Sequence, residues 1–135
     1  EVRISTGDVW GVVERLNEES RLFKETGGAQ VAEIFDGSSS VFAEDISRHC
    51  AIDKAIGIAF ECEMNLNTSA LVTSCRQTAS TIYKAIRSQV PIVITISAPT
   101  SLAIESARKF GITLIGFARG NRFNIYSHEW RVTGW

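Results

Sequence analysis

The side chains best suited to chemistry in this sequence are four arginines: Arg48, Arg76, Arg119 and Arg122. A guanidinium group binds phosphate oxygens in two-point geometry, so arginines that converge on one place favour a bound anion. Gly120 would let the backbone approach a ligand closely. Ser97, Thr100 and Ser101 add hydroxyls beside a predicted helix start. Together these residues predict a site for a phosphate-bearing ligand.

A simpler explanation exists for each arginine taken alone. An exposed guanidinium is often only solvated or paired with an acid, as Arg48 would be with Glu44 or Asp45. The elements that position the four arginines decide between the two interpretations.

Periodicity predicts those elements. Apolar residues at helical spacing predict helices over 6–19, 47–61, 78–89 and 101–110. Apolar, β-branched runs predict strands over 29–35, 41–44, 70–74, 91–97, 112–117 and 123–127. Thr6 is a plausible N-cap of the first helix, which would turn Val9, Trp10 and Leu16 to one side. Helix and strand then alternate, which is typical of an α/β fold. We predict one domain over 1–135, a three-layer α/β/α arrangement with a mixed, mostly parallel sheet.

In such a sheet, ligands bind beyond the carboxyl ends of the strands. Four segments are expected to meet there: 44–49, 74–76, 97–101 and 117–122. We call this place the carboxyl edge. All four arginines fall within it, together with the amino-termini of three helices, whose free N–H groups also favour anions. The predicted topology therefore favours the interpretation that the four arginines converge on one anion site.

Composition narrows the classes of function. The 135 residues are 44% hydrophobic and 21% charged, with a net charge of −1 and a pI near 6.2. This balance argues against a broad basic surface for nucleic acid or a membrane. No apolar run reaches the roughly 18 residues of a membrane span. The three cysteines are odd in number and widely spaced, which favours reduced thiols and a cytoplasmic location.

Cys75 is the cysteine with two open interpretations. It follows a buried strand and precedes Arg76, so a cation and a helix amino-terminus could lower its pKa and make the thiol reactive. Alternatively, it fills space. Cys62, near a helix end, is interpreted as a small core residue. The zinc-deaminase signatures H-x-E and P-C-x-x-C are absent from the sequence, so we expect no zinc site.

Three stretches carry a resemblance to a known family: "TGGAQVA", "EDISRHCAIDKAIG" and "SAPTSLAIESARKFGITLIGFARGNRFNIYSH". They resemble the FdhD family, the formate dehydrogenase accessory sulfurtransferases. The resemblance implies a cytidine deaminase-like fold and a homodimer. It also implies that sulfur passes as a cysteine persulfide from a cysteine desulfurase to the molybdenum cofactor of formate dehydrogenase, Mo-bis(molybdopterin guanine dinucleotide). The residues that match the family's cofactor-binding segment are Phe117, Ala118, Arg119, Gly120, Asn121 and Arg122.

The sequence also departs from the family pattern. The family's persulfide cysteine lies in a C-x-x-C motif upstream of "TGG", whereas no cysteine precedes Thr26 here. Either an amino-terminal portion is missing, or this is a short relative without it. Gln30 stands where histidine is usual, and Cys75 stands where glycine is usual. Binding therefore carries over better than sulfur transfer, and whether the chain is itself an enzyme stays open.

Three hypotheses follow. The first is an accessory protein that binds the molybdenum guanine-dinucleotide cofactor, or a GDP-like guanine nucleotide, with formate dehydrogenase and a cysteine desulfurase as partners. The second is a stand-alone guanine-nucleotide or pterin-binding module without sulfur transfer. The third is a hydrolase on a deaminase-like fold. The aromatic carboxyl-terminal tail, with Trp130 and Trp135, adds a reason to expect a homodimer.

Overall fold

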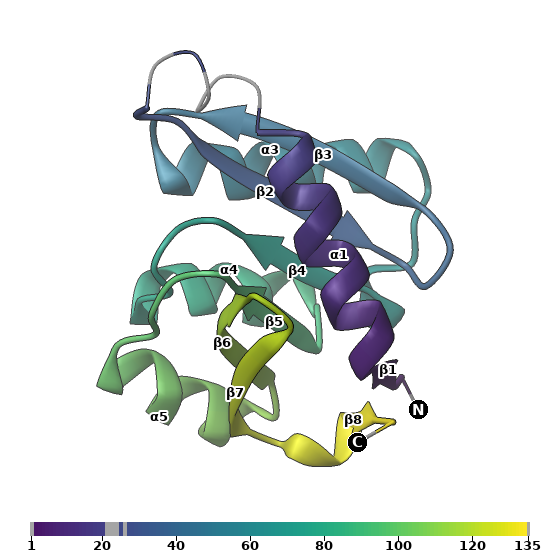
Figure 1. Ribbon diagram of the computed structural model, residues 1–135, viewed down its shortest axis with the longest axis vertical. Helices are drawn as coiled ribbons and strands as arrows, with labels where there is room; N and C mark the ends of the chain where they lie inside the picture. The colour runs from purple at the N-terminus through teal and green to yellow at the C-terminus, as the bar shows by residue number, and fades with distance from the viewer. Residues whose placement is uncertain (1, 21–24, 26, 135) are drawn as a thin grey trace.

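A six-stranded mixed sheet forms the centre of the molecule (Figure 1). The computed structural model describes residues 2–20, 25 and 27–134. The strand order is β3-β2-β4-β5-β6-β7. The strands are β2 (Gln30–Phe35), β3 (Ser40–Asp45), β4 (Ala70–Thr73), β5 (Ile92–Thr95), β6 (Thr113–Arg119) and β7 (Arg122–Ser127). A second, two-stranded parallel sheet pairs β1 (Ile4–Ser5) with β8 (Val132–Thr133) and so joins the two ends of the described chain.

The strand directions set where the loops go. β4, β5 and β6 are parallel to one another, whereas β2 is antiparallel to both β3 and β4. β3 therefore runs in the same direction as the three central strands, and β7 returns antiparallel to β6. The carboxyl ends of β3, β4, β5 and β6 consequently lie at one edge of the sheet, as predicted.

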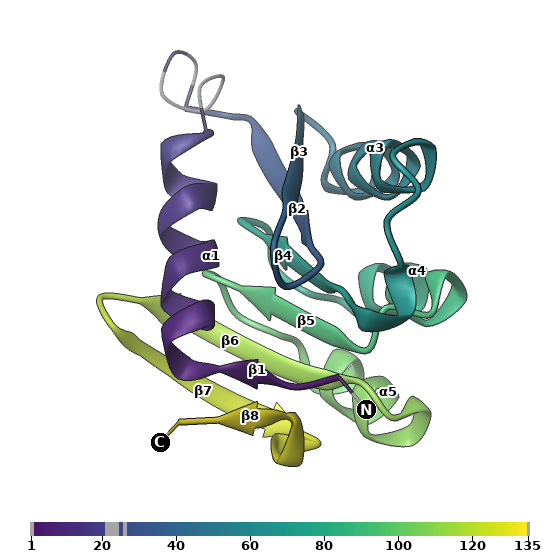
Figure 2. The ribbon, with the colours of Figure 1, turned by 90° about the vertical axis from the view of Figure 1, so that its right-hand side faces the viewer.

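Helices cover both faces of the sheet (Figure 2). They are α1 (Thr6–Glu18), α3 (Arg48–Glu61), α4 (Ala79–Ser88) and α5 (Ser101–Phe110), with 3₁₀ turns at Leu66–Thr68 and Glu129–Arg131. Among these four helices, α1 lies on one face, and the other three lie side by side on the opposite face. The three-layer α/β/α prediction is confirmed.

α1 packs through a narrow apolar stripe. Val9, Val12 and Leu16 are fully buried against the sheet. The N-cap is Ser5 and not Thr6, because the Ser5 hydroxyl accepts the Asp8 N–H at 3.0 Å. The Thr6 hydroxyl instead donates to the Gly134 carbonyl and helps to hold the two chain ends together.

Trp10 departs from the expected inward face of α1. Its side chain is 42% exposed. A one-residue step along a helix turns a side chain by about 100°, so the neighbour of the fully buried Val9 lies outside the buried stripe.

Small residues let the other three helices approach the sheet closely. Six alanines of these helices are buried in that half of the core: Ala51, Ala55, Ala59, Ala85, Ala103 and Ala107. α4 begins with a capping box formed by Thr78 and Thr81. α5 ends at Gly111, whose φ of 77° is left-handed, as its position after the helix predicts.

A fifth segment reaches the carboxyl edge in addition to the four predicted ones. Because β2 is antiparallel to β4, the amino end of β2 lies beside the carboxyl end of β4. Ser74 fixes this junction: its N–H donates to the Val31 carbonyl, and its hydroxyl accepts the Val31 N–H at 2.9 Å. The same hydroxyl donates to the Gln30 side chain at 3.1 Å. Gln30 thus belongs to this edge.

Candidate anion-binding site at the carboxyl edge

The end of β6 and the turn into β7 form the most strained part of the carboxyl edge. Phe117 has a φ of 53° and Asn121 a φ of 60°, both in the left-handed region. The ladder between β6 and β7 is irregular between Gly116 and Arg119. For a bulky residue such as Phe117 this conformation is an outlier that costs on the order of 1–3 kcal/mol. The surrounding structure therefore has to impose it.

Packing against the loop after β5 explains the strain. A Cβ atom on Gly116 would lie 2.9 Å from Cδ of Pro99 and 3.0 Å from the ring of Tyr126, so this position needs glycine. The Phe117 N–H donates to the Ser97 carbonyl at 2.9 Å. These contacts fix the backbone where the chain turns, and they leave the Phe117 side chain 43% exposed.

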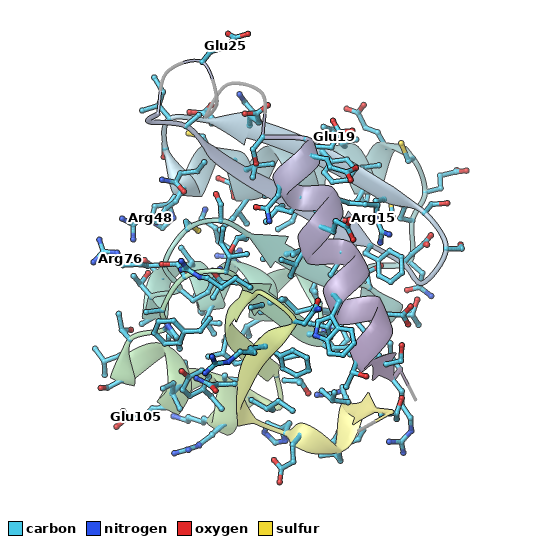
Figure 3. The ribbon with its side chains drawn as sticks, in the orientation of Figure 1. Arg15, Glu19, Glu25, Arg48, Arg76 and Glu105 are labelled. Atoms are coloured by element: carbon cyan, nitrogen blue, oxygen red, sulfur yellow. The ribbon has the colours of Figure 1, made fainter. Side chains whose placement is uncertain are left out.

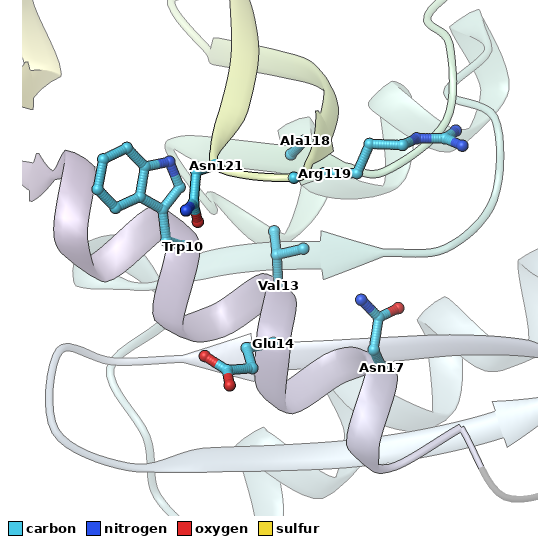
Figure 4. A pocket seen from close by; sticks show the side chains of 8 residues that line it. Trp10, Val13, Glu14, Asn17, Ala118, Arg119 and Asn121 are labelled. Carbon is cyan, nitrogen blue, oxygen red and sulfur yellow. The ribbon is translucent and has the colours of Figure 1, made fainter.

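Two pockets flank residues 117–122, which we call the hairpin loop. The first, of about 590 Å³, is the hairpin pocket, lined by Phe117, Arg119, Arg122, Phe123 and Asn124. The second, of about 410 Å³, is the α1 pocket, lined by Trp10, Val13, Glu14, Asn17, Ala118, Arg119, Gly120 and Asn121 (Figure 4). Arg119 lines both, and every residue of the predicted binding segment lines at least one. Volumes of this order suit small organic ligands.

The side chains of three of the four arginines, Arg48, Arg76 and Arg122, make no hydrogen bond or ion pair within the described part of the chain. Arg76 and Arg122 are both exposed. Arg119 donates to the Ile96 carbonyl at 2.8 Å, which fixes its orientation. Asp45 pairs with Lys54 at 2.7 Å, so this acid does not neutralise Arg48 as the simpler explanation allowed. Most of the guanidinium N–H donors at the carboxyl edge are therefore available to bind a ligand.

The arginines fall into two groups. Arg119 and Arg122 share the hairpin pocket. Arg48 and Arg76 extend from one side of the molecule, at the starts of α3 and of the loop before α4 (Figure 3). They line neither of the two pockets. The convergence is therefore close for two arginines and looser for the others.

The hydroxyl residues have different placements. Thr100 is the N-cap of α5, and its hydroxyl accepts the Ala103 N–H at 3.1 Å. Ser101 is the exposed first residue of that helix. Ser97 is partly buried, and its N–H donates to the Thr95 hydroxyl. Among these three side chains, that of Ser101 is the most open to a ligand.

A buried polar network supports the loops after β4 and β5. Gln77 is fully buried; its amide nitrogen donates to the Thr73 hydroxyl, and its amide oxygen accepts from the Thr81 hydroxyl, both at 2.8 Å. Its backbone exchanges hydrogen bonds with Ala98 and Thr100 of the next loop. Gln77 was not among the residues predicted from the sequence. A polar residue one position before a threonine helix cap is the only local sign of such a role.

Cys75 corrects the expectation of a lowered pKa. The thiol is 5% exposed, and burial raises its pKa, although the nearby charge of Arg48 opposes the rise. The Cys75 carbonyl accepts the Thr95 hydroxyl at 2.6 Å, which holds the loop inward. Cys62, expected in the core, is exposed at the end of α3. The placement favours the space-filling interpretation of Cys75.

A buried carboxylate lies beneath α1. Glu33 of β2 is fully buried; one of its oxygens accepts the Ser40 hydroxyl at 2.5 Å and lies 3.5 Å from Nε of Arg15. The other oxygen has no hydrogen-bond partner among the described residues. Desolvation by burial raises the Glu33 pKa to about 7, against the smaller opposing effects of Ser40 and Arg15.

Within residues 2–20, 25 and 27–134, no three metal-ligating side chains gather into a cluster. In the same residues, no helix has the length and apolar character of a membrane span.

The fold and the edge together define a class: a mixed α/β/α domain that presents an arginine-bearing hairpin loop beside two open pockets. The model of the FdhD/NarQ family matches residues 1–133. The chain belongs to the FdhD/NarQ family.

Individual relatives agree with this assignment. A protein of Methanothermobacter thermautotrophicus named "Sulfur carrier protein FdhD" is 37% identical over 132 residues, covering 98% of this chain and 53% of that protein. A protein of the same name from Sulfurisphaera tokodaii is 41% identical, covering 96% of this chain and 52% of that protein. This chain therefore spans about half the length of these relatives.

A solved structure shows the same fold. The crystal structure of a putative formate dehydrogenase accessory protein from Desulfotalea psychrophila superimposes with a TM-score of 0.90 at 25% identity. The match covers 98% of this chain and 60% of that one. The similarity to cytidine deaminases remains a prediction.

Proposed function

We propose that this chain binds the molybdenum guanine-dinucleotide cofactor for a formate dehydrogenase accessory protein and supports sulfuration of that cofactor. The cofactor is the cargo of the protein. The observation that carries the proposal is the pair of arginines, Arg119 and Arg122, that share the hairpin pocket beside a backbone held in a strained shape. The names of the relatives support the accessory role.

The residues present suit such a ligand. A guanine dinucleotide carries phosphates, which guanidinium groups bind in charge-assisted pairs. The Arg122 side chain makes no hydrogen bond or ion pair with the described residues, so its guanidinium group can bind a phosphate without breaking an internal contact. Arg119 stands between the two pockets, where one elongated ligand would cross from one to the other.

Binding is tested by calorimetry with GDP at fixed low salt. Arg122→Ala should weaken GDP binding by about 1–3 kcal/mol, because it removes one charge-assisted contact. Arg119→Ala should weaken it similarly, although it also releases the Ile96 carbonyl. Arg108→Ala, an exposed arginine near the end of α5, is the matched control and should bind GDP as the wild type does. Equal GDP affinity of the wild type and Arg122→Ala would contradict the proposal.

The sulfur that reaches the cofactor comes, in this proposal, from a cysteine desulfurase, carried by a cysteine other than Cys75. A thiol must ionise to attack a donor persulfide, and a buried thiol with a raised pKa is poorly suited to do so. The other proposed features are a formate dehydrogenase partner, a homodimer and a cytoplasmic location. The alternative is a guanine-nucleotide or pterin-binding module without sulfur transfer.

The cysteines allow a direct test. Cys62 should react with iodoacetamide near neutral pH at least about tenfold faster than Cys75, because Cys62 is exposed and burial raises the Cys75 pKa. Peptide mass spectrometry over time gives both rates in one sample. The same method, after incubation with a cysteine desulfurase and cysteine, should find no persulfide on Cys75. A persulfide there would overturn the assignment of the carrier.

A further inference from the structure

The α1 pocket contains polar groups that the phosphate-binding arginines do not explain. One wall is the hairpin loop, and the other is a face of α1 that presents Trp10, Glu14 and Asn17 (Figure 4). Positions four and seven residues apart lie on one face of a helix, so these three side chains form a row. Val13 and Ala118 add apolar surface between them.

Trp10 offers an aromatic surface at this pocket. Its ring lies next to Asn121 in the close view (Figure 4). Trp10 is 42% exposed, so its ring is not buried in the hydrophobic core. A planar heterocycle that stacks on such a ring gains about 1–3 kcal/mol whatever its substituents. Trp10 therefore favours a flat ligand but does not select among flat ligands.

Glu14 and Asn17 supply the selectivity. Neither side chain makes a hydrogen bond with the described residues, and both are exposed. An ionised carboxylate only accepts hydrogen bonds, with two oxygens side by side. It matches a ring edge that presents two adjacent N–H donors. It does not match the edge of adenine, which places an acceptor nitrogen beside its amino group. Asn17 can donate to a ring carbonyl next to that edge.

We propose that Trp10, Glu14 and Asn17 bind a 2-amino-4-oxopyrimidine ring, the ring edge shared by guanine and pterin. The ring N–H and the 2-amino group donate to the Glu14 carboxylate, and the ring stacks on Trp10. Arg119, which lines both pockets, then meets the phosphate attached to the same ligand. This inference rests on the proposed function, and it names the residues that read the base.

The test compares ligands that differ at this edge. GDP carries the 2-amino group, IDP lacks it, ADP reverses the donor pattern, and neopterin carries the edge without a phosphate. By calorimetry, the wild type should prefer GDP over IDP and ADP by about tenfold or more, the worth of a hydrogen bond to a charged group. Glu14→Gln should lower GDP affinity to that of IDP. Glu18→Gln, one turn further along α1 and outside the pocket, should keep the preference.

The results for Glu14→Gln distinguish the possible ligands. If this variant loses the preference for GDP but binds neopterin as the wild type does, the α1 pocket binds guanine. If it loses only neopterin binding, the α1 pocket binds pterin. Unchanged GDP, IDP and ADP selectivity in Glu14→Gln, with all three weakened by Arg122→Ala, overturns this inference and leaves the phosphate site intact. Absence of binding by GDP and neopterin to the wild type overturns both.

Discussion

Two parts of the carboxyl edge use polar residues in opposite ways. In the loops after β4 and β5, Gln77 and its threonine partners are buried and satisfy one another. In the hairpin loop, which comprises the end of β6 and the turn into β7, polar side chains are exposed, and Phe117 is held in a strained conformation. The first loops form a rigid support, whereas the hairpin loop keeps its polar groups open. The difference separates residues that hold the edge together from residues that we propose bind a ligand there.

The support formed by the loops after β4 and β5 depends on every buried polar group having a hydrogen-bond partner. A buried hydroxyl or amide without a partner costs about 1–3 kcal/mol, so a network is stable only while each member is satisfied. By contrast, an exposed arginine that loses its ligand returns to water at little cost. The two regions should therefore respond oppositely to substitution, in stability for one and in binding for the other.

The largest expected effect is from Gln77→Ala. It leaves the buried hydroxyls of Thr73 and Thr81 each short of a partner and opens a cavity, so the free energy of unfolding should fall by about 3 kcal/mol or more. Guanidinium chloride titration measures the change. Arg122→Ala, in the other region, should leave the same titration within about 0.5 kcal/mol of the wild type. Equal losses for the two variants would erase the distinction between support and binding loop.

Glu33 contrasts with the fully paired Gln77 network, because it is buried while one of its carboxylate oxygens has no hydrogen-bond partner among the described residues. Its folded-state pKa of about 7 lies above the ordinary value of 4.5, so the folded protein holds this proton more tightly than the unfolded chain. Stability from this group is fully present below pH 4.5 and is lost as the pH rises to about 7. Integrated over that window, the loss is about 3 kcal/mol.

Glu33→Gln should remove this pH dependence. The amide has no charge to desolvate, so the variant should be more stable than the wild type at pH 8 and should differ little from it near pH 4.5. Thermal unfolding across that pH range follows both. Glu105→Gln, on exposed α5 surface, should retain the wild-type profile. A wild-type stability that rises between pH 4.5 and 7, once the profile of Glu33→Gln is subtracted, would contradict a raised pKa.

The two regions also differ in how far the sequence predicts them. Periodicity predicts the helices and strands, and alternation predicts that Arg119 and Arg122 follow a strand to the carboxyl edge, because both are local patterns. Gln77 was missed because its role depends on contacts between separate loops. For the same reason the sequence left open whether Cys75 is a reactive thiol or fills space: the burial of a residue after a strand depends on how the neighbouring loops fold over it.

Other omissions have similar causes. The pairing of β1 with β8 involves two residues on each strand and joins opposite ends of the chain, so no local pattern shows it. Trp10 was assigned to the buried stripe of α1 because hydrophobicity does not distinguish a core position from the wall of a pocket. The α1 pocket itself arises only when the hairpin loop meets that helix.

The smallest expected effect concerns the strain at Phe117. A left-handed backbone suits glycine, so Phe117→Gly relieves strain of about 1 kcal/mol or more. It also loses some apolar contact and gives the unfolded chain more freedom, which costs a comparable amount. The net change in unfolding free energy should therefore be within about 1 kcal/mol.

GDP binding should respond differently, because the Phe117 side chain lines the hairpin pocket and its removal widens the space beside Arg122. GDP affinity should fall several-fold while the denaturation midpoint moves little. Phe110→Gly is no fair control, since it breaks a helix; Phe117→Ala is better, because it keeps the strain and removes the ring. If Phe117→Ala lowers stability more than Phe117→Gly while both weaken GDP equally, strain and binding are separate properties of this residue. If both variants bind GDP as the wild type does, the strained backbone serves the fold alone, and the contrast between the two regions disappears at this position.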